Sequence, residues 1–95
     1  MNTKASYATC VMLVLLRNAG KSTKSILQLS KYADKQMEKL NIKNGLSQST
    51  KYLVIRELIS TGILVSKNVE GMISISLSPD VMLYFKGEEK HEAVE

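Results

Sequence analysis

The side chains best suited to recognising another molecule lie between residues 47 and 60. Gln48 and Arg56 each carry a planar group that can form two hydrogen bonds at once, and Ser49 carries a small hydroxyl. Paired bonds of this kind fit the edges of adenine and guanine, and an outward leucine such as Leu53 can meet the methyl group of thymine. This segment therefore favours contacts in a groove of duplex DNA.

Helical spacing indicates which of these side chains point outward. At 100° per residue, Val54, Ile55 and Leu58 fall on one face. The opposite face carries Ser49, Leu53, Arg56 and Ser60, flanked by Gln48 and Tyr52. Ser47 is suited to capping the helix and, with Ser49, to contacting a phosphate at its N-terminus. The alternative is a face that meets only solvent; an outward Leu53 and a single acid, Glu57, argue against it.

Other chemistry has little support. His91 stands by itself in an acidic stretch, and Gly20-Lys21-Ser22 lacks the upstream glycine of a phosphate-binding loop. Cys10 is the only cysteine and lies in an apolar run, where it is expected to pack as a small hydrophobe. No acid–base pair with a nucleophile is formed by Asp34, Glu38 and Glu57. We therefore expect no enzyme, no cofactor and no metal site.

Charge is unevenly distributed along the chain. Residues 1–87 hold 12 basic and 5 acidic groups, a net charge of +7, whereas residues 88–95 hold four acids and one lysine. A basic domain suits nucleic acid as a partner, because the lysines are spread over several segments. Without a long apolar run to span a bilayer, we expect no membrane association and a cytoplasmic location. The expected organisation is one domain, 1–87, and a disordered acidic tail, 88–95.

Three helices must position these residues. The first is expected to be capped by Thr3 or Ser6 and to reach about Asn18, before Gly20. Its apolar residues cover nearly the whole circumference, so part of it must be buried under another element or against a partner.

The second helix is expected to be capped by Ser22 or Thr23 and to end in a turn at residues 41–45. Its apolar face carries Ile26, Leu29, Ala33, Met37 and Leu40, and its polar face carries Lys24, Lys31, Lys35 and Lys39. After Ser47, a helical pattern resumes from Thr50 to Thr61 and stops at Gly62.

Beyond Gly62 the pattern becomes alternating. A strand is expected from Ile63 to Val65, and a second from Met72 to Ser78. In the second strand, one side is expected to be buried and carries Ile73, Ile75 and Leu77. The hairpin tip is expected at residues 67–71, where Lys67 and Asn68 could reach a minor groove or a phosphate. Ser78-Pro79-Asp80 is typical of a helix start and leads into a short last helix, 81–85.

A family resemblance rests on the stretch from Leu46 to Leu64. The positions that carry it are Leu46, Ser47, Thr50, Tyr52, Ile55, Leu58, Gly62, Ile63 and Leu64. They resemble the recognition-helix region of PadR-like and MarR-like winged helix-turn-helix transcription regulators. The resemblance implies an α+β, mostly α, fold: three helices, a two-stranded wing and a short C-terminal helix. Lys51 departs from it, standing where those regulators often place an aliphatic residue.

What the resemblance implies about function is sequence-specific binding of double-stranded DNA by a dimeric repressor that inserts helix 47–60 into the major groove. The long dimerisation helices of those families have no counterpart here, so we expect a homodimer built from the first and last helices. The expected DNA-contacting residues are Ser47, Gln48, Ser49, Lys51, Tyr52, Leu53, Arg56, Lys67 and Asn68. Two alternatives stay open: a winged helix used as a protein–protein interaction module, and a DNA-binding replication or partition protein.

Overall fold

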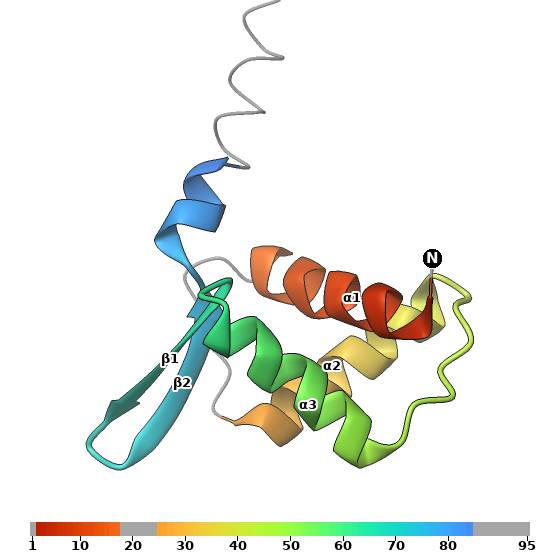
Figure 1. The fold of residues 1–95 in the computed structure, drawn as a ribbon, viewed down its shortest axis with the longest axis horizontal. Helices are drawn as coiled ribbons and strands as arrows, with labels where there is room; N and C mark the ends of the chain where they lie inside the picture. Colours follow the sequence, from red (N-terminus) through yellow and green to blue (C-terminus); the bar gives the residue numbers. More distant parts are fainter. Residues whose placement is uncertain (1, 18–24, 85–95) are drawn as a thin grey trace, which may run out of the picture.

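The computed structural model describes residues 2–17 and 25–84. Three helices come first: α1 (Thr3–Arg17), α2 (Ile26–Lys39) and α3 (Gln48–Ser60). Two strands follow, β1 (Leu64–Val69) and β2 (Met72–Leu77), and pair as an antiparallel sheet. A short helix over residues 79–84 ends the described part (Figure 1). The expected α+β, mostly helical order of elements is confirmed.

The first two helices begin at residues other than those expected. Asn2 caps α1, because its Oδ1 accepts a hydrogen bond of 2.7 Å from the amide of Ala5, whereas Thr3 and Ser6 lie inside the helix. Ser25 caps α2, and its Oγ accepts 3.0 Å from the amide of Gln28. Ser, Asn, Asp and Thr are all good caps, so the sequence offers several neighbouring candidates and only the helix geometry selects one. Residues 18–24 lie outside the described residues. They include the expected end of the first helix near Asn18, the expected caps of the second helix, and Lys24 of its polar face.

The expected cap of α3 is confirmed at Ser47, whose Oγ accepts a hydrogen bond from the amide of Thr50. The helix itself begins at Gln48, two residues earlier than the apolar pattern predicts, because its first turn is polar. Gly62 ends it with φ of +84°, and the amide of Ile63 donates 3.0 Å to the carbonyl of Leu58. This is the Schellman arrangement, which needs a left-handed residue after the C-cap.

Helix α2 ends in the same way, but with an asparagine in the left-handed position. Asn41 has φ of +59°, and the amide of Ile42 donates 2.9 Å to the carbonyl of Met37. Leu40, expected on the buried face, becomes the C-cap and is 47% exposed. The lysines Lys31, Lys35 and Lys39 are exposed, as their spacing predicts.

The hairpin turn is shorter than expected. Only Glu70 and Gly71 lie between the strands, with φ of +54° and +79°, as a two-residue type I′ turn requires. Lys67 and Asn68 therefore lie within β1 and not at the tip, and Ile63 precedes the strand. Glutamate is an unusual first residue for such a turn, which is why the sequence did not indicate it.

The core is built around α1, which contacts α2, α3 and β2. Every large apolar residue of α1 is buried or half-buried, and its all-round apolar character is explained by packing within the chain. The fully or largely buried apolar residues are Tyr7, Cys10, Val11, Val14, Leu15, Leu29, Ala33, Met37, Val54, Ile55, Leu64, Ile75 and Leu77. Cys10 packs as the small hydrophobe expected, and burial raises the pKa of its thiol.

The hairpin projects beyond this core: in Figure 1 the turn between β1 and β2 lies beyond the helices. Ile75 and Leu77 are buried as predicted. Ile73 was expected with them but is 46% exposed, because it pairs with Asn68, one pair from the turn at the projecting end of the hairpin. The alternation identifies its face correctly but not where the core ends.

The short last helix begins as the sequence predicts. Pro79 is its first residue, and the Oγ of Ser78 accepts 3.3 Å from the amide of Asp80. Val81 and Met82 pack against the core. Phe85 and the acidic stretch 88–95 lie outside the described residues. Within residues 2–17 and 25–84, no helix is long and apolar enough to cross a membrane.

Tyr7 makes the stability of this core sensitive to alkali. Burial raises the pKa of its hydroxyl well above the ordinary value, and the negative charge of Asp34 raises it further. The neutral phenol is therefore favoured by folding, so its contribution is complete below about pH 10 and is lost as the pH rises above that value.

We expect the free energy of unfolding to fall between about pH 10 and 11.5 in the natural chain, and to fall less in Tyr7→Phe. Urea titrations at pH 8, 10 and 11 measure this difference. Tyr32→Phe is the matched control, because Tyr32 is 40% exposed. Parallel pH profiles for the natural chain and Tyr7→Phe would contradict the assignment.

Candidate nucleic-acid interface

The outward face of α3 carries the side chains that helical spacing placed there. Leu53 is 57% exposed, and Ser49, Arg56 and Ser60 are exposed as well. On the opposite side, Val54 and Ile55 are buried. The helix therefore presents a mixed polar and apolar surface while its other face is held in the core.

The N-terminus of α3 gathers three hydroxyls. The Oγ of Ser47 lies 3.2 Å from that of Ser49 and 2.9 Å from Oγ1 of Thr50. Ser47 and Ser49 are exposed, and the free amides of a first helical turn attract anions. Gln48 is also exposed, although its Nε2 reaches back over 3.4 Å toward the Oγ of Ser30 on α2.

Lys51 has a different environment from its neighbours. Its Nζ lies 3.0 Å from Oδ1 of Asp34 on α2, and only 13% of its side chain is exposed. The same oxygen of Asp34 accepts 2.8 Å from Nδ2 of Asn44, in the segment between the helices. One carboxylate therefore ties α2, the connecting segment and α3 together. Sequence reasoning missed Asp34, because its partners lie ten and seventeen positions away with no local pattern to connect them.

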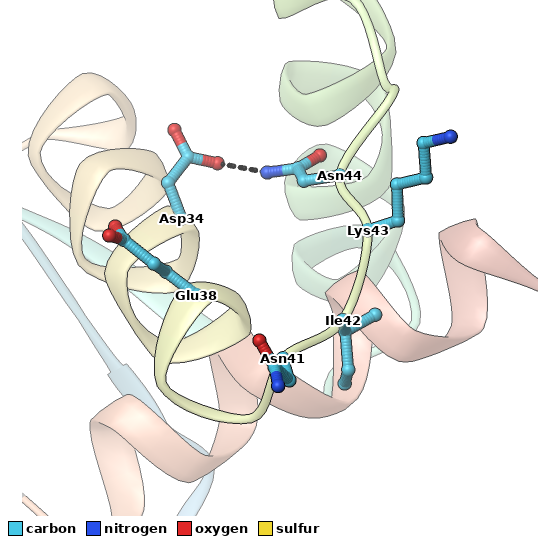
Figure 2. Close-up of a pocket in the computed structure, with 6 residues that line it drawn as sticks. All are labelled: Asp34, Glu38, Asn41, Ile42, Lys43 and Asn44. Atoms are coloured by element: carbon cyan, nitrogen blue, oxygen red, sulfur yellow. Dashed lines mark hydrogen bonds between the residues drawn. The ribbon is translucent and has the colours of Figure 1, made fainter.

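A cleft of about 480 Å³ opens beside this cluster. It is lined by Asp34, Glu38, Asn41, Ile42, Lys43 and Asn44. Figure 2 shows Asp34 and Asn44 pointing toward one another across it, while Lys43 points away. Oδ1 of Asn44 is buried and has no hydrogen-bond partner among the residues that the structure describes. Because the hydrogen bond and the ion pair occupy Oδ1 of Asp34, we interpret the cluster as a structural brace.

The brace makes a testable contribution to stability. Asp34→Ala leaves the ammonium of Lys51, on a side chain that is only 13% exposed, without this counter-ion and the Asn44 amide without its acceptor. We expect the free energy of unfolding to fall by about 1–2 kcal/mol, because the carboxylate itself is partly exposed. Chemical denaturation measures the loss. Glu38→Ala, on the same helix and lining the same cleft, is the control and should change stability by less than about 0.5 kcal/mol; equal losses would refute the brace.

The hairpin separates its two candidate residues. Lys67 pairs with Ser74 and Asn68 pairs with Ile73, and cross-strand partners share a face of the sheet. Lys67 and Asn68 are both exposed but lie on opposite faces. Met72 and Ile73 expose 58% and 46% beside them, an apolar character of the hairpin end that sequence reasoning missed.

The charge of the α3 surface is nearly balanced. Arg56 and Glu57 are both exposed, Lys51 is paired, and Tyr52 is half-buried. Three exposed lysines lie together instead on α2, at Lys31, Lys35 and Lys39. Any nucleic acid on α3 would therefore be held by few cations and by polar groups.

Comparison with models of known protein families, with curated proteins and with solved structures finds no match to this chain.

Proposed function

We propose that this chain is a winged helix-turn-helix protein that binds duplex DNA in a sequence-specific manner and regulates transcription as a dimeric repressor. The observation that carries the proposal is the outward face of α3, where Ser49, Leu53 and Arg56 are exposed on a helix whose other side is fixed in the core. The order of three helices and a hairpin, and the resemblance of residues 46–64 to PadR-like and MarR-like regulators, support it.

In this proposal α3 enters the major groove. Gln48 and Arg56 are eight residues apart, which corresponds to about 12 Å along a helix axis. Since base pairs are stacked about 3.4 Å apart, the two side chains would read bases three or four steps from each other. Leu53 lies between them and would meet a thymine methyl group.

The remaining candidate residues receive supporting roles. Ser47 and Ser49 contact a phosphate at the start of α3, and Lys67 on the hairpin contacts a flanking phosphate. Asn68 faces the other side of the hairpin and makes a separate contact, and Tyr52 flanks the reading face. Lys51 positions α3 through Asp34 and does not itself neutralise a phosphate, because its ammonium is paired and its side chain is largely buried.

A second copy of the chain is the proposed partner of the last helix. Leu83 and Tyr84 are each 65% exposed there, whereas α1 uses its apolar residues within the chain. A two-fold dimer would read half-sites about one helical turn, roughly 10 base pairs, apart. Sedimentation equilibrium should give a dimer; a monomer at micromolar concentration would contradict this part of the proposal.

Selection of binding sites from random duplex DNA tests the central claim. We expect enrichment of a two-fold symmetric sequence. With one phosphate neutralised by Lys67 in each chain, a dimer neutralises two, and its affinity for the two-fold site should fall about 12-fold between 50 and 200 mM salt. Absence of any enriched sequence, or an affinity that barely changes with salt, would overturn DNA recognition by α3.

A protein–protein module is the second candidate, and one observation favours it. The α3 surface combines Leu53, 57% exposed, with the opposite charges of Arg56 and Glu57, so the exposed side chains there carry no net charge. Surfaces with an apolar centre and a balanced polar rim are common at protein interfaces. Failure of the DNA selection, together with unchanged folding of the chain, would favour this alternative.

A further inference from the structure

A second cleft lies between α1 and α2, away from the outward face of α3. It encloses about 240 Å³, enough for a small molecule and less than a typical drug-sized pocket. It is lined by Val14, Arg17, Tyr32, Lys35, Gln36 and Lys39. Three of these six residues are cations and none is an acid.

The positive charge of this cleft is not neutralised within the described part of the chain. Neither Lys35 nor Lys39 forms an ion pair among residues 2–17 and 25–84. Lys31, Lys35 and Lys39 are also spaced four residues apart on one helix, where like charges repel and mildly destabilise the helix. A bound anion would relieve this repulsion.

The arginine of the cleft is held in place by a buried group. Nη1 of Arg17 donates 3.0 Å to Oε1 of Gln36, and Gln36 is only 4% exposed. A guanidinium has five N–H donors, so this bond orients the group and leaves others for a ligand. Tyr32, 40% exposed, adds a ring to the wall, and its hydroxyl accepts 3.3 Å from Nε2 of Gln28. The cleft therefore offers a ligand an oriented guanidinium group, two flexible ammonium groups and an aromatic ring.

The position of the cleft separates it from the outward face of α3. Helix α2 contacts α3 through Ser30 and Asp34. At 100° per residue, Lys35 and Lys39 lie about 100–180° around α2 from those contacts. The cleft therefore opens on a different side of α2 from the one that packs on α3.

We propose that the cleft between α1 and α2 binds a small organic phosphate. Arg17, Lys35 and Lys39 hold the dianionic phosphate, and Tyr32 and Val14 contact the apolar or aromatic part of the molecule. Arginine and lysine are the usual phosphate ligands in proteins, and three cations match a dianion better than a single carboxylate. The inference does not depend on DNA binding by α3.

Calorimetric titration of the full chain with phenyl phosphate tests the proposal, with inorganic phosphate and benzoate titrated at the same ionic strength. We expect saturable binding with one site per chain, tighter for phenyl phosphate than for either comparison compound. The double variant Lys35→Gln/Lys39→Gln should lose at least about tenfold in affinity, because two charge-assisted contacts are removed. Lys31→Gln is the matched control: it removes an exposed charge of α2 that does not line the cleft, and should change affinity less than about threefold.

Several results would each overturn the proposed phosphate site. No saturable binding of phenyl phosphate, or equal losses in Lys31→Gln and the double variant, would overturn the site. Chemical shift changes on titration should be confined to the end of α1 and to α2, and changes centred on α3 would also overturn it. If the double variant instead weakens binding of duplex DNA and leaves phenyl phosphate unaffected, the cleft is a nucleic-acid surface and the small-ligand proposal fails. Far-UV circular dichroism and thermal unfolding without ligand establish that each variant is folded.

Discussion

Replacing Ile55 with alanine is expected to lower the free energy of unfolding by about 2–5 kcal/mol. Ile55 is fully buried and is the α3 residue most deeply set in the core. The loss combines the transfer energy of the missing carbons with the cost of the cavity that remains. Since small domains are stable by only about 5–15 kcal/mol, this change would bring a chain of this size near the limit of folding.

Leu53→Ala is the matched control for that prediction. It removes a similar amount of apolar side chain from the same helix, but Leu53 is 57% exposed. We expect a change in unfolding free energy of less than about 0.5 kcal/mol. Urea denaturation followed by circular dichroism measures both variants. Similar losses in the two would mean that α3 packs on the core with a different face from the one described.

Arg56→Ala is expected to weaken binding to a selected DNA site by about 1–3 kcal/mol, or roughly 5- to 150-fold, if α3 reads the major groove as proposed. Arg56 is the only cation on the outward face of α3, since Lys51 is paired with Asp34. The variant should also discriminate less between the selected site and a scrambled duplex, because a contact to a base edge carries sequence information. Fluorescence anisotropy at one fixed salt concentration measures both quantities.

Arg17→Ala changes the net charge by the same amount on α1, where the side chain bonds Gln36 of α2 and is not part of the outward face of α3. We expect it to weaken DNA binding less than about threefold, through long-range electrostatics alone. Equal effects of the two arginine variants would show that Arg56 contributes only its charge. That result would remove base recognition from α3 while leaving the fold unaffected.

Local patterns were sufficient for the elements of this fold. Apolar spacing and turn residues give the order of three helices and two strands, the Ser47 cap and the buried side of α3. These features depend on neighbours within about four positions, so they can be read directly from the chain. Pro79 as the first residue of the last helix belongs to the same class.

The structural features that the sequence patterns did not predict depend mostly on contacts between distant parts of the chain. The pairing of Lys51 with Asp34 brings two helices together, and no sequence spacing indicates it. The exposure of Ile73 follows from its place near the turn of the hairpin and not from the alternation around it. The caps at Asn2 and Ser25 were missed for another reason: several adjacent residues were chemically suitable, and small energy differences decide among them.

The two-stranded hairpin also bears on how the chain behaves at high concentration. In the described part of the chain the sheet contains only β1 and β2, so each strand has an outer edge whose backbone groups are available to another strand. Met72 and Ile73 expose apolar surface near the same end. Such edges can pair with a strand of another molecule, and short strands and charged side chains oppose this pairing. Here each strand has six residues, and Lys67 and Glu70 lie near Met72 and Ile73. The hairpin thus has unpaired backbone groups that could bond a strand of another molecule, and charged side chains nearby that oppose this self-association.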